Sequence, residues 1–403
     1  MGLMKRNKNL SYSLLLNVVN AFFPMFSIPL ITVSVGLSSY GHYVYAGLIT
    51  NILIAIFSNG LFSYYLRAYL SDHETLGEII GVQFLFILFA FIMQLIFIFA
   101  MNVYNDPIFI IFSVVTLSHC ICVEWYFYGK GELSILFYRT LAIKILSLIA
   151  IYVLSNITSN IIYFALVSAG ALIASNITGY LLLIKDERII IKISSPKKNL
   201  SNVKYFISNA ALGSIYQYLD QVIISIVASR QDLAFLNLYK QLINGVNSFP
   251  GIINRVLMKD SQKEYEKENF KAHVTRLFSR YFFITATGCI GLFFTINMVA
   301  EYLARVAIPT INLTSFISSF LVFAVAMAVF IDTQISVITH KEKITTYANL
   351  GVATTTLLLM IPLVQRFSFN GGLLSLAIGE TVGVAIMIFL HIKSGTFKQR
   401  HEI

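Results

Sequence analysis

Apolar runs of about 20 residues recur along the whole chain, separated by short polar connections. A helix of that length crosses the roughly 30 Å of hydrocarbon in a bilayer. The runs are continuous, unlike the alternating segments of an outer-membrane barrel, and so they favour helices over strands. The twelve predicted spans are residues 9–34, 41–64, 78–102, 107–128, 134–155, 160–184, 204–228, 234–257, 276–299, 314–337, 345–364 and 370–392. The predicted fold class is an all-α polytopic membrane protein.

Composition and charge support this class and orient it. Of the 403 residues, 57% are hydrophobic and 12% charged, against about a quarter charged in soluble domains. Most of the basic residues lie at the two termini and in the connections that follow the even-numbered spans. By the positive-inside rule, both termini are then cytoplasmic. The net charge of +10 therefore reports topology, and we expect no nucleic-acid partner.

The chain divides near its middle into two sets of six spans. The long basic connection at 185–203 separates them. We predict an N-terminal six-helix lobe at 1–190, a cytoplasmic linker at 191–203 and a C-terminal six-helix lobe at 204–403. Duplicated halves of this kind are typical of transporters, in which the substrate site lies between the halves. We therefore expect about 12 helices in two lobes around a central cavity.

Several charged residues fall inside the predicted spans. A charge at that depth costs a few kcal/mol and usually faces water or a partner. Lys240 and Lys144 fit either a cavity wall or a neutralised structural pair, and Glu124 and Arg139 can pair across neighbouring helices. The candidate ion-coupling or gating residues are Asp220, Glu380, Asp332, Glu124 and Arg139.

Polar residues also form stripes at helical spacing. In the eighth span, Lys240, Asn244 and Asn247 follow one another at steps of three and four residues, which places them on one helix face. The first span repeats this pattern, the seventh span has a similar stripe, and the second span has a shorter one. These stripes suit either hydrogen bonds between helices or the wall of a hydrated cleft. The candidate substrate-binding residues are Lys240, Lys144, Asn244, Asn247, Asn17, Asn20 and Tyr216.

Sequence signatures of catalysis are absent. The chain has no HExxH, no phosphate-binding glycine loop and no GxSxG, and its three cysteines lack metal-ligand spacing. We therefore expect no catalytic residue, no metal and no cofactor. Energy for transport would come from an ion gradient, a partner or the substrate gradient.

The segment Glu124-Trp125-Tyr126-Phe127-Tyr128-Gly129-Lys130-Gly131-Glu132 resembles a signature of the Wzx-type polysaccharide flippases. These O-antigen transporters belong to the multidrug/oligosaccharidyl-lipid/polysaccharide (MOP) exporter superfamily, which includes the MATE transporters. Trp125 and Gly129 match the signature, whereas Tyr128 stands where glutamine is usual. A second similarity lies at 219–224 in the seventh span.

This resemblance implies a substrate, a location and partners. The substrate would be an undecaprenyl-pyrophosphate-linked O-antigen or polysaccharide repeat unit, moved across a bacterial inner membrane by alternating access. Lys240 and Lys144 would meet the pyrophosphate as point charges. A polysaccharide polymerase and a chain-length regulator are the implied protein partners.

Two other functions remain open. A MATE-like drug or cation antiporter would share the fold and differ in substrate. A membrane-embedded polysaccharide polymerase or glycosyltransferase generally has long outward loops, whereas the longest predicted outward connection here runs only from about residue 300 to 312.

Overall fold

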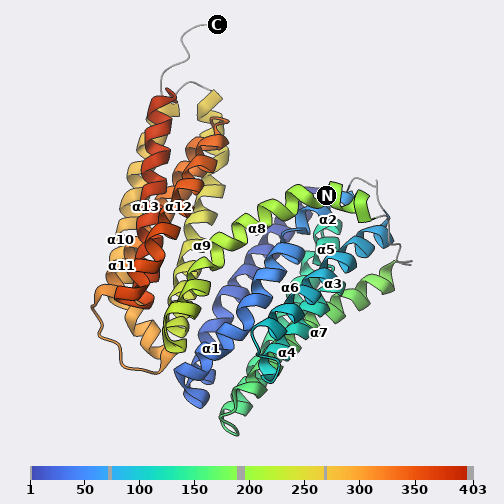
Figure 1. The fold of residues 1–403 in the computed structure, drawn as a ribbon. Helices are drawn as coiled ribbons and strands as arrows, with labels where there is room; N and C mark the ends of the chain where they lie inside the picture. The colour runs from blue at the N-terminus through green and yellow to red at the C-terminus, as the bar shows by residue number, and fades with distance from the viewer. Residues whose placement is uncertain (1, 71–74, 188–195, 267–269, 397–403) are drawn as a thin grey trace. The chain divides into compact units, whose positions relative to one another are not determined.

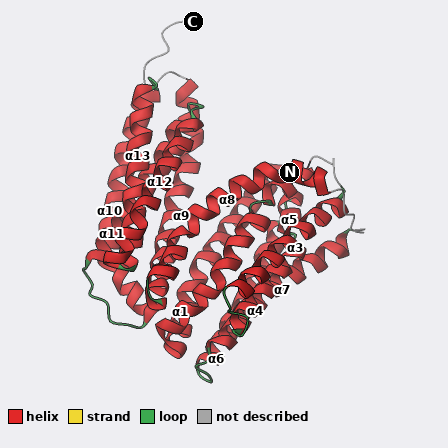
Figure 2. Cartoon of the chain, viewed as in Figure 1, coloured by secondary structure: helices red, strands yellow, loops and turns green. Residues whose placement is uncertain are grey.

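The computed structural model describes residues 2–70, 75–187, 196–266 and 270–396. Within these ranges the secondary structure is helical, without strands (Figure 2). The contacts divide the chain into two compact units, residues 1–222 and 223–403. The boundary falls within a helix, later than the predicted linker at 191–203. The division into two six-helix lobes stays a prediction.

The first unit contains helices that lie side by side (Figure 1). Their bounds are α1 Gly2–Ile54, α2 Phe62–Leu70, α3 Leu76–Ala100, α4 Pro107–Ser118, α5 Glu124–Lys130, α6 Leu133–Ser155, α7 Ile161–Asp186 and most of α8 Pro196–Val227, with a π-helix at Ala55–Asn59 and a 3-10 helix at His119–Ile121. Helix α1 bends at Gly36, whose backbone has φ 78° and ψ 162°. Glycine adopts positive φ without steric cost. This bend divides α1 into the first span and the start of the second.

The second unit is also a helical bundle (Figure 1). It comprises the end of α8, then α9 Arg230–Glu266, α10 Phe270–Ala304, α11 Leu313–Ile331, α12 Glu342–Phe367 and α13 Phe369–Lys393, with a π-helix at Asp332–Ser336. Helix α11 begins with a capping box, in which Asn312 Oδ1 accepts from the Ser315 backbone N–H at 3.0 Å. Such a cap satisfies backbone donors that a helix start leaves open.

The structure accounts for the twelve predicted spans. Nine helical stretches among the described residues are long and apolar enough to cross a membrane, and one of them, Ser11–Leu70, is 60 residues long and bends at Gly36. That stretch supplies two spans. Helices α8 and α9 supply two more, since they have 32 and 37 residues but carry the polar stripes that lower their hydropathy. The prediction of an all-α multi-pass membrane protein is confirmed.

The helices differ from the prediction mainly in length. Helix α8 begins at Pro196, inside the predicted linker, and α9 continues to Glu266 although the eighth span was predicted to end at 257. Backbone hydrogen bonding continues into these polar segments because a helix satisfies its own backbone in water as well as in lipid.

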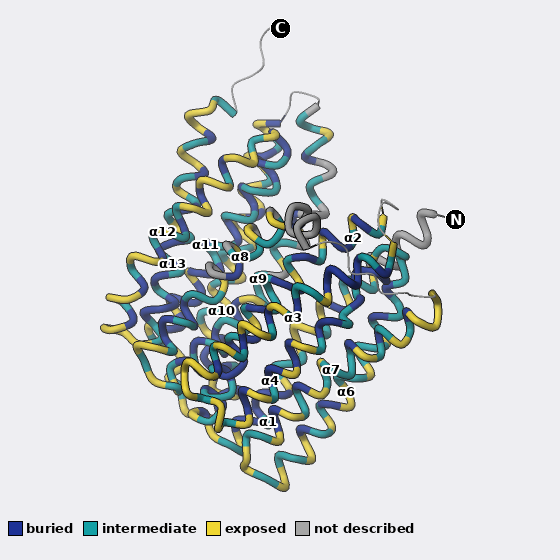
Figure 3. Tube along the Cα trace, turned by 45° about the vertical axis from the view of Figure 1, so that its right-hand side comes forward, coloured by how far each residue is buried: buried dark blue, intermediate teal, exposed yellow. Residues whose placement is uncertain are grey.

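Large apolar side chains are exposed along the helices, and not only at their ends (Figure 3). On α6, for example, Ile145, Leu146 and Ile149 are 50%, 66% and 55% exposed. Monomeric soluble proteins rarely expose contiguous apolar surface on this scale. The hydrocarbon of a bilayer accommodates it.

Candidate substrate path and gating residues

Helix α9 carries the polar stripe predicted for the eighth span. It begins where Ser229 Oγ donates to Asp232 Oδ2 at 2.6 Å and accepts from the Asp232 backbone N–H at 3.1 Å. One face of the helix is buried in the second unit, with Leu236 and Tyr239 at 0% and 1% exposure. The stripe residues Lys240, Asn244 and Asn247 are less completely covered by the side chains of this unit.

The predicted residues of this stripe are partly accessible. Lys240 and Asn247 are half-buried and Asn244 is exposed. Asn247 Oδ1 is a buried acceptor without a hydrogen-bond partner in the described part of the chain. The stripe therefore offers a cation and amide groups to a polar ligand.

The N-terminal end of the α9 stripe is held by Asn297 of α10. Tyr239 donates from its hydroxyl to Asn297 Oδ1 at 2.7 Å. Asn297 Nδ2 in turn donates to the Pro309 carbonyl at 2.8 Å and to Asn312 Oδ1 at 2.9 Å. Both Tyr239 and Asn297 are fully buried. This network ties α9 to α10 and to the connection before α11.

The C-terminal end of the stripe is held by a second network. Asn254 Nδ2 donates to the Tyr281 hydroxyl at 3.1 Å, and Gln334 Nε2 donates to the Asn254 carbonyl at 2.6 Å. Ser261 Oγ donates to Gln334 Oε1 at 2.6 Å. Buried polar networks with paired donors and acceptors rigidify the elements they join. The polar stripe thus lies on a helix fixed at both ends, with Pro250 between them.

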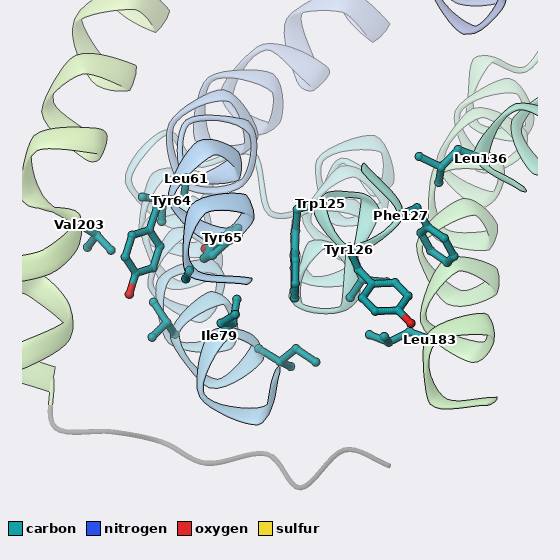
Figure 4. Packing of buried hydrophobic residues seen from close by; sticks show 14 of the residues in the cluster. Leu61, Tyr64, Tyr65, Ile79, Trp125, Tyr126, Phe127, Leu136, Leu183 and Val203 are labelled. Atoms are coloured by element: carbon teal, nitrogen blue, oxygen red, sulfur yellow. The ribbon is translucent and has the colours of Figure 1, made fainter. Parts of the chain in front are cut away.

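In the first unit, the Trp125 motif lies at a break in the fourth span. Helix α4 ends at Ser118 and α5 begins at Glu124. Trp125 is 1% exposed and lies between Tyr65 and Tyr126 in an aromatic cluster (Figure 4). Its indole N–H donates to Gln83 Oε1 of α3 at 2.9 Å. Packing of this kind makes the motif a structural anchor at the end of the bundle.

Glu124 and Arg139, which the sequence suggested as a pair, are in contact. Arg139 Nη2 donates to Glu124 Oε1 at 2.7 Å. The arginine side chain is 7% exposed and the glutamate side chain is 44% exposed. A Cβ added to Gly179 of α7 would meet the guanidinium, so this glycine leaves room for it. Their gating role stays a prediction.

Gly129 is required by close packing. A Cβ built at this position would lie less than 3 Å from the ring of Tyr69. The glycine of the motif thus lets α5 approach α2 closely.

Replacing Gly129 with alanine is expected to destabilise the protein by about 1–3 kcal/mol, because overpacking forces the Tyr69 ring to move. Thermal unfolding in detergent measures the effect. Gly170→Ala is the matched control, since a Cβ there would meet no heavy atom within 4 Å. Equal unfolding temperatures for the two variants would contradict this explanation of the motif.

The remaining candidates lie at separate places in the two units. Lys144 of α6 is half-buried, with its ammonium 4.5 Å from the Phe23 ring centroid of α1, which is a cation–π distance. Asn17 and Asn20 are exposed on α1. Asp220 is 0% exposed, and its Oδ1 accepts from the Gln221 backbone N–H at 2.8 Å. Of the candidate residues, Glu124 and Arg139 are brought together by a hydrogen bond between their side chains.

The candidates in the later helices are also spread out. Asp332 opens the π-helix after α11, and its Oδ1 accepts from Thr345 of α12 at 2.6 Å. Glu380 is half-buried on α13. Tyr216 lies in α8, but its side chain is outside the described residues. The site roles of all these residues stay predictions.

Sequence reasoning missed the buried amides that hold the helices together. Gln83 and Gln94 of α3, Asn254 of α9 and Asn297 of α10 are each almost completely buried. Gln94 Nε2 donates to Thr50 Oγ1 at 2.7 Å, and its Oε1 accepts from Thr116. The signal was an amide side chain inside an apolar span, where an unsatisfied polar group is costly.

Comparisons with known proteins identify the fold. No family model and no curated protein matches the chain. Among solved structures, the lipid II flippase MurJ in an inward closed conformation is 14% identical with a TM-score of 0.72, covering 96% of this chain and 89% of that one. A multidrug resistance MATE family transporter in an inward-facing conformation is 10% identical, with a TM-score of 0.63 and coverage of 95% and 96%. A MOP superfamily transporter from Pyrococcus furiosus is 12% identical, with a TM-score of 0.51 and coverage of 97% and 96%.

The chain has the MOP fold. The MOP fold has about twelve membrane-spanning helices. The comparison therefore confirms the fold class expected from the sequence. The match extends over 96% and 95% of this chain, so the likeness is not confined to one of its halves.

Proposed function

We propose that this protein is a flippase that moves a lipid-linked, anionic oligosaccharide across the bilayer. The observation that carries the proposal is the α9 stripe, in which half-buried Lys240 is followed by Asn244 and Asn247 on a helix fixed at both ends. A cation and neighbouring amides suit a pyrophosphate and sugar hydroxyls. The similarity in fold to a lipid II flippase supports this substrate class.

The specific substrate that we propose is an undecaprenyl-pyrophosphate-linked O-antigen or polysaccharide repeat unit. Its lipid tail would stay in the bilayer while the sugars pass through a polar path. The protein would lie in a bacterial inner membrane with both termini cytoplasmic, and its activity would be transport rather than catalysis. A polysaccharide polymerase and a chain-length regulator are the proposed partners.

Reconstitution into liposomes tests the function. The probe is a fluorescent undecaprenyl-pyrophosphate-linked oligosaccharide placed in both leaflets, and a membrane-impermeant glycosidase outside measures the fraction that can be reached. We expect the protein to raise this fraction from about half toward completion within minutes. No difference from protein-free liposomes would overturn the proposal.

The alternative is a drug or cation antiporter, favoured by the fold similarity to a multidrug resistance MATE transporter. The same liposomes, loaded with a proton or sodium gradient, test it with ethidium as the probe. Gradient-driven ethidium uptake without movement of the oligosaccharide would favour the antiporter.

A further inference from the structure

The break between α4 and α5 exposes backbone carbonyls inside a membrane span. Residues His119–Ile121 form a 3-10 turn, and Cys122 and Val123 leave helical geometry, with ψ of 100° and 31°. Carbonyls in such a stretch lose their α-helical partners, although the His119 carbonyl still accepts from the Cys122 backbone N–H at 3.2 Å. In hydrocarbon, each unsatisfied backbone group costs several kcal/mol, so irregular backbone persists there only where protein groups or water satisfy it.

The side chain of Gln83 provides hydrogen bonds to the backbone carbonyls at this break. Its Nε2 donates to the His119 carbonyl at 2.7 Å and to the Cys122 carbonyl at 2.8 Å. Its Oε1 accepts from the Trp125 indole N–H at 2.9 Å. Gln83 is 1% exposed, so water does not substitute for these bonds. One amide from α3 therefore binds both sides of the break.

The bonds from Gln83 to His119, Cys122 and Trp125 form a clamp that lies at the start of α5. Trp125 is the second residue of α5, and Glu124, the first, contacts Arg139 of α6. We propose that Gln83 is a positioning residue, which fixes the broken fourth span so that Glu124 is held against the buried Arg139. If the transport function proposed above holds, the clamp also acts on any gating step that uses this pair.

Cys122 is a native probe of the break. It is half-buried and lies between the two segments that Gln83 joins. The experiment uses the full chain with Cys120 and Cys289 replaced by serine, and it measures the rate at which a small maleimide labels Cys122 in detergent. Gln83→Met keeps the size of the side chain but removes both donors and the acceptor, and we expect labelling at least tenfold faster than in the parent. Labelling at the parent rate would overturn the proposal.

Gln94→Met is the matched control. Gln94 lies on the same helix, is equally buried and also bonds to α4, through Thr116. Its loss leaves the break satisfied, so we expect the parent labelling rate. Trp125→Phe removes one bond of the clamp, and an intermediate rate is expected. If Gln83→Met does not fold, the Trp125→Phe variant tests the proposal instead. An unchanged labelling rate in a folded Trp125→Phe protein would contradict the clamp.

Gln83→Glu adds a readout that a purely structural role would not change. When protonated, the carboxyl donates one hydrogen bond to a carbonyl and accepts from Trp125, whereas the carboxylate can only accept. The groups that contact it are the backbone carbonyls of His119 and Cys122 and the indole N–H of Trp125. Relative to the parent at each pH, labelling of Gln83→Glu should rise as the pH increases from 6 to 9. A ratio that stays the same across this pH range would contradict the role of the amide donors.

Coupling to Glu124 is tested by thermal unfolding, without any transport assay. Glu124→Gln should lower the unfolding temperature less in the Gln83→Met protein than in the parent, because the pair with Arg139 is already displaced. In the Gln94→Met protein it should have its full effect. Equal effects in all three backgrounds would contradict the positioning role. These results decide the proposal whether or not the protein moves lipid-linked sugars.

Discussion

Replacing Glu124 with leucine is expected to destabilise the protein by about 3 kcal/mol, because Arg139 would be left as a buried charge without its partner. The estimate is at the low end for a broken buried pair, since the glutamate side is 44% exposed and water reaches it. The change is measured as a shift of the unfolding temperature in detergent. Size-exclusion chromatography of samples heated to increasing temperatures detects the unfolding.

The reverse replacement should cost less. Arg139→Leu leaves Glu124, whose half-exposed carboxylate can be hydrated, and the arginine site becomes apolar. The double variant Glu124→Leu/Arg139→Leu should recover much of the stability lost in Glu124→Leu, as is found when a buried pair is replaced by apolar residues. A double variant that is as unstable as the sum of the single ones would contradict a direct interaction between the two side chains.

The spans were predictable because length and hydrophobicity are local properties. Twelve apolar runs predicted twelve membrane-spanning helices, and their number and length predicted an all-α polytopic membrane protein. The break in the fourth span was not predictable, because 107–128 reads as one apolar run. The break depends on Gln83, which is distant in the sequence and lies on the preceding span. Tertiary hydrogen bonding decided the local structure.

The polar stripes were harder to interpret, because helical spacing does not distinguish an anchor from a path. Thr50, in the short stripe of the second span, is buried and bonded to Gln94. Asn254, two turns beyond Asn247 and on the same side of the helix, is buried and anchors α9 to Tyr281. Lys240 and Asn244, earlier on the same helix, remain partly accessible. Burial, which requires the neighbouring helices, separates the two classes.

The fourth span, in the first unit, and the tenth span, in the second unit, share an arrangement of helix breaks. Each is irregular near its end, at His119–Ile121 and at Asp332–Ser336. A carboxylate at each irregular stretch bonds to the following long helix, from Glu124 to Arg139 and from Asp332 to Thr345. Buried Gln83 of α3 bonds to the first stretch, whereas buried Gln334 lies within the second stretch and bonds to the Asn254 carbonyl of α9.

Replacing Lys240 with alanine is expected to lower the rate of oligosaccharide flipping roughly 10- to 100-fold while the protein stays folded. A hydrogen bond to a charged group contributes about 1.5–3 kcal/mol, and each 1.4 kcal/mol corresponds to a factor of about ten. Lys240 is only half-buried, and the adjoining Tyr239 holds α9 through Asn297, so the helix should keep its place without the lysine. The liposome assay measures the rate, and the unfolding temperature checks the fold.

Matched variants separate the role of this charge from a general loss of basic residues. Lys343→Ala removes an exposed lysine from the start of α12 and should leave the rate unchanged. Lys240→Arg keeps the charge but replaces a compact ammonium with a planar guanidinium, so partial activity is expected. Lys240→Glu should abolish flipping, since a carboxylate repels a pyrophosphate. Full flipping by a folded Lys240→Glu protein would exclude the α9 stripe from the path of an anionic substrate. Lys144 on α6 would then be the remaining candidate cation for that path.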